Sequence, residues 1–217
     1  ELLGTAILLG AIVGSGIAVE RAIPGEPGLQ LLGNAAATAL MLAAMIVAFG
    51  PVSGAHLNPV VTMTARIGSE VGGAAAGLYV VAQVAGATIG AIVANLMFGL
   101  PAATWSTTRR AGGTMWLSEA LATFGLVLVV RLVGRRGRQA ETGLAVGVFV
   151  GAAIVFTPST CFANPAVTLA RMLSDTFTGI APSSVPLFLT AQVAGALGAM
   201  VCERIWTHQD RVPAIRG

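Results

Sequence analysis

The chain contains no lysine, and few of its residues carry charge. All twelve basic residues are arginine, 10% of the 217 residues are charged, and there are only two cysteines. Soluble domains carry about 25% charged residues, so this shortage excludes an ordinary soluble domain. Two cysteines are too few for a disulfide framework. The net charge of +3 and the pI near 9.7 do not indicate nucleic-acid binding, and they fit basic loops facing the cytoplasm.

The sequence also lacks the residue patterns of common enzyme classes. It has no Ser/His/Asp set, no Walker-type phosphate loop and no His/Cys cluster at metal-ligand spacing. We therefore expect no enzyme activity, no catalytic residue, no bound metal and no cofactor.

Apolar sequence is what the chain has in abundance. Hydrophobic residues make up 55% of it, and its mean hydropathy is +0.84. Segments of about 18–27 apolar residues are long enough to cross a bilayer with some tilt. Six segments qualify: 2–20, 30–50, 72–98, 114–134, 140–157 and 184–206. The sequence thus predicts an all-α membrane protein with six spans, in contact with lipid.

An internal repeat links the two halves of the chain. The segment SGAHLNPVVTMTAR (53–66) is echoed by STCFANPAVTLAR (159–171), and the hexamer AQVAGA occurs at 82–87 and again at 191–196. Repeated Asn-Pro steps at matching positions of two apolar halves are typical of a transport path through a membrane.

Each Asn-Pro step predicts the start of a helix. Asn caps the free N–H groups, and the prolines, Pro59 and Pro165, fit the first helical position. The two helices should cover about 58–68 and 164–173. Ten residues at about 1.5 Å each reach only about half-way through a bilayer core, so these are half-helices.

The repeat pattern predicts two units that lie upside down relative to each other. Residues 1–98 form the first unit, 99–114 an external linker, and 115–217 the second unit; Glu1 and Glu119 mark corresponding starts. Each unit holds three spans and one half-helix. Because an odd number of spans inverts the second copy, the half-helices should enter from opposite faces.

The positions of the arginines predict the orientation. The loop between the fourth and fifth spans is arginine-rich and should face the cytoplasm. Alternation then places eight arginines inside (66, 131, 135, 136, 138, 204, 211 and 216) and four outside (21, 109, 110 and 171). Both termini are therefore predicted to be cytoplasmic.

The chain resembles the aquaporin and aquaglyceroporin family along essentially its whole length. The doubled Asn-Pro motif, the SGAHLNP lead-in and the repeated Glu starts carry this resemblance. It implies a right-handed bundle of six spans and two half-helices, assembled as a homotetramer with one pore per subunit. It implies a channel and no enzyme chemistry.

The resemblance also assigns roles to single residues. Asn58 and Asn164 are expected to donate hydrogen bonds to solutes at the pore midplane, where the positive ends of the half-helices repel cations. Glu1 and Glu119 are expected to hold the loops that carry the half-helices. His56 is expected to line the cytoplasmic vestibule with its backbone carbonyl facing the solute; the alternative is a packed loop histidine.

One position departs from the family pattern. Most members have Arg after the second Asn-Pro-Ala, where this chain has Val167. The other filter positions, carried over by their distance from each Asn, are Thr38, Ala152 and Cys161. A hydroxyl, a methyl, a thiol and a branched alkyl group predict a filter that is wider and less polar than a water-selective one.

These features predict a passive channel for small uncharged solutes. The missing Arg and the stretch 162–182 look like a bacterial branch associated with arsenic resistance, which implies the bacterial inner membrane and solutes such as arsenite and methylated arsenicals. An ordinary water or glycerol facilitator is the first alternative. A coupled secondary transporter, which also uses inverted repeats and broken helices, is the second.

Overall fold

The protein is described by a computed structural model that covers residues 1–135 and 137–209. The predictions that concern Arg136, Arg211 and Arg216 therefore lie outside the described residues. The described part is helical, and six of its helices are long and apolar enough to cross a membrane. This agrees with the six predicted spans.

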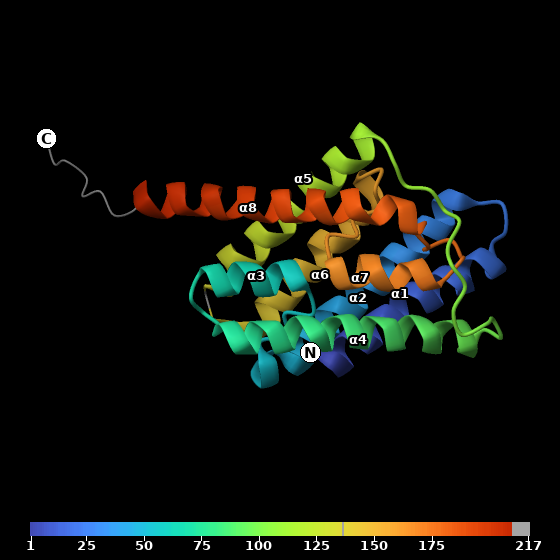
Figure 1. The fold of residues 1–217 in the computed structure, drawn as a ribbon, viewed down its shortest axis with the longest axis horizontal. Helices are drawn as coiled ribbons and strands as arrows, with labels where there is room; N and C mark the ends of the chain where they lie inside the picture. The colour runs from blue at the N-terminus through green and yellow to red at the C-terminus, as the bar shows by residue number, and fades with distance from the viewer. Residues whose placement is uncertain (136, 210–217) are drawn as a thin grey trace, which may run out of the picture.

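The long helices form the bundle drawn in Figure 1. They are α1 (Leu2–Ala22), α2 (Pro27–Ser53), α4 (Gly73–Met97), α5 (Gly113–Gly134), α6 (Gln139–Phe156) and α8 (Val185–Gln209). The short elements are α3 (Pro59–Ile67), α7 (Pro165–Ala170) and the 3₁₀ turns η1 (Arg171–Leu173) and η2 (Pro182–Ser184). The second half-helix is therefore α-helical for only six residues, and it continues to Leu173 as a 3₁₀ turn.

Helix pairs within and between the two halves build the bundle. α1 packs along α4, α5 packs along α8, and α2 packs along α6. α3 and α7 lie almost end to end between them, and their Asn-Pro ends meet near the middle of the molecule (Figure 1). The long helices thus form a wall around two short helices that approach from opposite ends.

Glycines of the repeated AQVAGA hexamer allow the closest of these helix contacts. A Cβ atom on Gly86 would lie 2.2 Å from the carbonyl oxygen of Leu2, and one on Gly195 would lie 2.1 Å from that of Ala120. Any side chain there would push α4 from α1, or α8 from α5. The repeated hexamer is therefore explained in part by packing.

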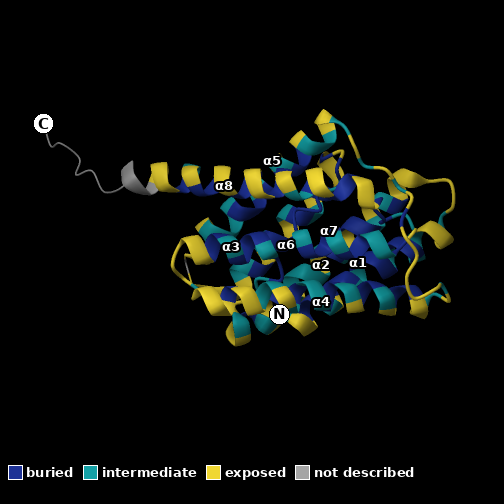
Figure 2. Ribbon diagram, in the orientation of Figure 1, coloured by how far each residue is buried: buried dark blue, intermediate teal, exposed yellow. Residues whose placement is uncertain are grey.

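Polar residues lie inside the bundle, and large apolar residues lie outside it. Glu119, Gln83 and Gln192 are fully buried, whereas Val52, Leu40 and other large apolar side chains are among the exposed residues. Exposed positions gather on the outward faces of the helices (Figure 2). Such a distribution suits a protein whose outer surface contacts lipid.

Candidate functional site

The two Asn-Pro asparagines cap their own helices and also reach across to the opposite loop. Asn58 Oδ1 accepts the N–H of Val60, and Asn164 Oδ1 accepts the N–H groups of Ala166 and Val167. The amide nitrogens donate to the other repeat over 2.8 Å: Asn58 Nδ2 to the carbonyl of Ala163, and Asn164 Nδ2 to that of Leu57. Each half-helix is thus fixed to the loop of its counterpart.

These cross-bonds refine the expected role of the asparagines. An amide NH₂ group has two hydrogens, and the bond to the opposite loop uses only one of them. Asn58 and Asn164 are 5% and 6% exposed, and both line a cavity. One N–H of each amide therefore remains for a passing oxygen atom, and donation to a solute stays a prediction.

Glu1 and Glu119 hold the two loops through their backbone amides. Glu1 accepts the N–H groups of His56 and Leu57, and Glu119 accepts those of Phe162 and Ala163. The side-chain hydroxyl of Ser53 also donates to Glu1. These contacts place both carboxylates where a loop-holding role requires them.

The carboxylates also determine where the loop carbonyls point. In a trans peptide, the N–H of one residue and the C=O of the preceding residue point in opposite directions. Because the amides of His56 and Leu57 face Glu1, the carbonyls of Ala55 and His56 point away from Glu1. Both residues line the cavity, so these carbonyls face it. The same geometry at Glu119 turns the Cys161 carbonyl toward the cavity.

Left-handed backbone conformations at non-glycine residues make this arrangement possible. Ala55 and Leu57 have φ of 48° and 49°, and Cys161 and Ala163 have φ of 47° and 45°. Each such conformation costs free energy and persists only when its surroundings enforce it. Here the hydrogen bonds to the carboxylates of Glu1 and Glu119 enforce it, so backbone strain is concentrated in the two loop segments that bear the carbonyls.

Gln83 and Gln192 complete the two frameworks, although sequence pattern alone assigned them no role. Gln83 Nε2 donates to Glu1 and to Thr62 Oγ1, and Gln192 Nε2 donates to Glu119 and to Thr168 Oγ1. The signal was present, because each glutamine is the polar residue of the repeated AQVAGA hexamer. Each threonine lies four residues after its Asn, on the same helix face.

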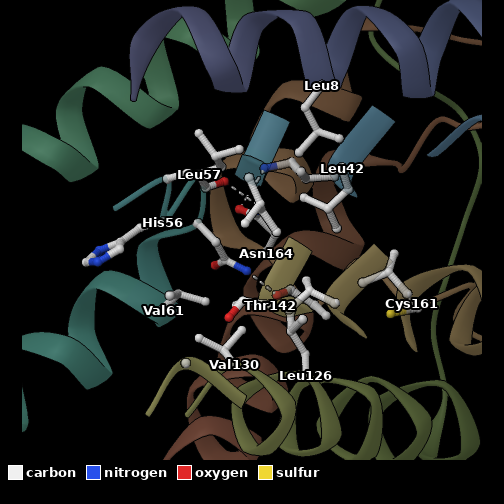
Figure 3. A pocket seen from close by; sticks show the side chains of 18 of the residues that line it. Leu8, Leu42, His56, Leu57, Val61, Leu126, Val130, Thr142, Cys161 and Asn164 are labelled. Atoms are coloured by element: carbon white, nitrogen blue, oxygen red, sulfur yellow. Dashed lines mark hydrogen bonds between the residues drawn. The ribbon is translucent and has the colours of Figure 1, made fainter. Parts of the chain in front are cut away.

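A cavity of about 320 Å³ lies inside the bundle, lined by Asn58 and Asn164 and by four of the long helices. Its helical walls are Leu8 and Ile12 of α1; Asn34, Thr38, Leu42 and Ile46 of α2; Leu126 and Val130 of α5; and Thr142, Val146, Val150 and Ile154 of α6. The spacing of four residues is that of a single helix face. Figure 3 shows His56 and Cys161 at opposite sides of the cavity, with Asn164 between them.

His56 faces the cavity at its α3 end. Its ring Nδ1 lies 3.1 Å from Thr62 Oγ1, and its ring packs edge-on against Tyr79 at a centroid separation of 5.5 Å. Burial lowers the pKa of His56, although the carboxylates of Glu1 and Glu70 act in the opposite direction. The imidazole is therefore neutral at physiological pH.

Of the four predicted filter residues, the structure brings three to the cavity and leaves out Ala152. Thr38, Cys161 and Val167 are buried and line it, whereas Ala152 is exposed on the outer face of α6. The prediction for Ala152 was wrong because the distance from Asn164 was carried over without regard to the face of α6. Two residues along a helix turn the direction by about 200°, so Ile154 takes this place.

Thr38 carries the polar group of this filter. Its Oγ1 is buried and has no hydrogen-bond partner among the described residues. Cys161, Ile154 and Val167 contribute a thiol and two branched alkyl groups. An unsatisfied buried hydroxyl costs free energy, which a solute oxygen in the cavity would recover.

Glu70, Arg131 and Arg135 line the α3 end of the cavity, and a buried glutamate behind them, Glu203, pairs with both arginines. Glu203 of α8, 3% exposed, pairs with Arg131 and lies 2.7 Å from Arg135. Arg131 also pairs with Glu70 at 3.1 Å. This network joins α5, α8 and the α3–α4 loop, so it fixes the geometry of that end. Within the described residues, no three potential metal ligands gather.

Comparisons with known proteins agree with this architecture. Residues 1–163 match the family described as major intrinsic protein. The chain is 42% identical to an aquaglyceroporin, AqpS, of Rhizobium meliloti, over 100% of this chain and 91% of that protein. It is 34% identical to a probable aquaporin, AqpM, of Archaeoglobus fulgidus, over 75% and 71% of the two chains.

A solved structure shows the same fold. The aquaglyceroporin from Plasmodium falciparum superposes with a TM-score of 0.71 at 20% sequence identity, covering 98% of this chain and 94% of that one. Together with the family match and the relative of 42% identity, the six spans, the paired half-helices and the cavity between them make this chain a membrane channel and not an enzyme. The chain is a member of the major intrinsic protein family, the family of the aquaporins and aquaglyceroporins.

Proposed function

We propose that this channel conducts small uncharged solutes through an arginine-free filter, and that its solutes include neutral metalloid hydroxides such as arsenite and methylated arsenicals. The observation that carries the proposal is the chemistry of the filter wall. Val167, at the position where the resemblance to the family implies Arg, lies in the cavity wall with Thr38, Cys161 and Ile154.

The filter suits a solute that has both hydroxyl and apolar groups. Thr38 Oγ1 offers one hydrogen-bonding group without a protein partner. Val167 and Ile154 offer alkyl surface, which favours carbon or methyl groups over water. Ile154 in place of the expected Ala152 makes the wall more apolar and narrower than the sequence indicated. A methylated arsenical presents such a mixture, and so does glycerol.

A panel of solutes in proteoliposomes tests the proposal. Swelling or uptake is measured for water, glycerol, urea and arsenite, with protein-free liposomes as the background. We expect glycerol and arsenite to permeate well above this background. Permeation by water alone would reject the proposal, and glycerol without arsenite would leave the ordinary glycerol facilitator as the function.

A coupled transporter makes a different prediction in the same vesicles. It would carry solute against its gradient when a proton or sodium gradient is imposed. We expect flux to follow the solute gradient alone, because Glu1 and Glu119 are already engaged by loop amides and glutamines.

We also propose that the channel is a homotetramer in the bacterial inner membrane, with both termini in the cytoplasm. The relative from Rhizobium meliloti is bacterial, and Arg131 and Arg135 lie at the α3 end of the cavity, opposite Arg171 at the α7 end. Arginine-rich loops favour the cytoplasmic side. Cross-linking in membranes and protease accessibility of tagged termini test assembly and orientation.

A further inference from the structure

Arg171 lies at the α7 end of the cavity, one helical turn beyond the filter. It is the first residue of η1 and follows Val167 by four residues. Four residues correspond to about 6 Å along a helix. The side chain is only 5% exposed, and it lines the cavity. A buried guanidinium is thus part of the cavity wall just outside the arginine-free filter.

An aromatic ring and a backbone carbonyl hold this guanidinium in place. Arg171 Cζ lies 3.5 Å from the centroid of the Phe162 ring, and its Nε donates to the carbonyl of Thr178. Arg110, from the linker between α4 and α5, lies 5.1 Å from the same centroid and donates to the carbonyl of Gly179. The Phe162 ring therefore contacts two guanidinium groups, and of these two only that of Arg171 lines the cavity.

Among the described residues, Arg171 has no ion-pair partner, and the carboxylate that acts on its charge, Glu119, is held by the loop amides and by Gln192. In the part of the chain that the structure describes, neither Arg171 nor Arg110 forms an ion pair, and the two terminal nitrogens of Arg171 have no hydrogen-bond partner. Burial and the nearby Arg110 lower the pKa of Arg171, but a guanidinium stays protonated in proteins. A fixed positive charge with free donors therefore borders the cavity.

The two repeats show why this arginine faces inward. Arg66 follows Asn58 by eight residues and is exposed, whereas Arg171 follows Asn164 by seven and is buried. One residue fewer turns the side chain by about 100° around the helix. The shorter second motif therefore brings its arginine to the cavity, while the corresponding residue of the first motif stays on the surface.

We propose that Arg171 determines charge selectivity at this end of the channel, in place of the arginine that is absent at Val167. An arginine at position 167 would provide both the constriction and the positive charge. Here Val167 stands at the constriction, and the charge of Arg171 lies one helical turn away. Val167 leaves the filter apolar and uncharged, and Arg171 repels cations before they reach it. This inference rests on the proposed passage of uncharged solutes.

Replacing the charge while keeping the packing tests this role. Arg171→Gln retains a donor for the Thr178 carbonyl, and Arg171→Lys retains the charge. Arg110→Gln is the matched control, since it removes the second cation over the Phe162 ring, which does not line the cavity. Sodium and proton leakage and glycerol swelling are measured in the same proteoliposomes. We expect Arg171→Gln to raise cation leakage by about tenfold or more, and the other two variants to stay near the wild-type level.

The glycerol measurement separates the possible failures. Wild-type vesicles without glycerol flux would contradict the proposed function and not the role of Arg171. Arg171→Gln that passes glycerol but no cations would overturn the inference, as would equal leakage in Arg110→Gln.

If neither Arg171→Gln nor Arg171→Met yields a folded channel while Arg171→Lys does, leakage is measured in Val167→Glu, whose carboxylate can pair with Arg171 one turn away. Absence of leakage there would reject the inference, and loss of all three Arg171 variants would show a structural residue and reject it too.

Discussion

Glu1 and Glu119 hold the loops before α3 and α7 through corresponding amides, glutamines and threonines, but the loops present different side chains to the cavity. The first offers His56, a partly exposed imidazole bonded to Thr62. The second offers Phe162, a buried ring that carries Arg171 and Arg110. The framework is thus duplicated, whereas the surfaces that meet the solute are not.

This contrast indicates which residues serve the fold and which serve selection. The equivalent residues that lie behind the cavity wall, namely the two glutamates, glutamines and threonines, fix backbone positions, whereas the two Asn cap their helices and also line the cavity. Residues that differ between the repeats face the solute from opposite ends. A substitution in the shared framework should therefore reduce stability, and one in the unmatched residues should change selectivity.

Removing the carboxylate of Glu119 should have the largest effect. Glu119→Ala leaves three buried donors unpaired, on Phe162, Ala163 and Gln192. At about 1 kcal/mol or more per donor, we expect the free energy of unfolding to fall by roughly 3 kcal/mol or more, and solute flux to be lost. Denaturant unfolding of the purified channel measures this. Glu1→Ala is the matched control and should cost less, because Glu1 is partly exposed and water can replace it. Equal losses would show that burial does not distinguish the two sites.

Changing both Asn58 and Asn164 to Asp should allow cations to cross the pore midplane. The caps survive because a carboxylate also accepts the helix N–H groups, but the donors to the carbonyls of Ala163 and Leu57 are lost. Two negative charges then face the cavity, so we expect a cation current where the wild type has none. Planar-bilayer recording measures it. A folded double variant without current would mean that the midplane does not decide cation exclusion.

Val167→Arg should make the cavity beside α7 narrower and more positively charged. The added side chain lies one turn before Arg171, in the cavity wall. We expect glycerol and arsenite flux to fall by about tenfold and water flux to fall less, since the smaller solute needs less space. Stopped-flow swelling measures both. Val61→Arg places the same charge at the corresponding position of the first repeat, which also lines the cavity, and so tests whether the position of the charge matters. Unchanged glycerol flux in Val167→Arg would show that Val167 is not in the filter.

A mercurial should block the channel through Cys161. The thiol is buried beside the filter and lines the cavity, whereas Cys202 lies on α8 and does not line it. We expect Cys161→Ser to remove the block and Cys202→Ser to retain it, with basal flux measured in each. The opposite result would place Cys161 outside the path of the solute.

The smallest effect should come from His56. Because burial lowers its pKa below the ordinary 6.5, the ring is uncharged at neutral pH and gains a proton only in more acidic solution. We expect glycerol flux to be constant from about pH 7 to about pH 8 and any change to appear below 6.5. His56→Gln should remove that acid-dependent change. A transition between pH 7 and pH 8 that His56→Gln abolishes would contradict the assignment.

Much of the fold could be predicted because it depends on local pattern. The six spans follow from runs of apolar residues, and the half-helices follow from Asn58-Pro59 and Asn164-Pro165. Ala152 could not be placed correctly from sequence spacing, because the face that a residue presents depends on where α6 packs. The only sequence signal for Gln83 and Gln192 was the repeated hexamer in which they occur. Their roles could not be predicted because their hydrogen-bond partners lie on other elements.

The sequence by itself determined the membrane character of the chain, its two half-helix motifs and the valine after the second Asn-Pro-Ala. These features depend only on composition and on the spacing of residues along the chain. Tertiary structure decided that each Asn binds the opposite loop, that Ile154 lines the cavity in place of Ala152, and that Arg171 turns inward onto Phe162. Each of these depends on which helix face meets which neighbour. A turn of 100° per residue makes that relation sensitive to a single position, and only the packed bundle fixes it.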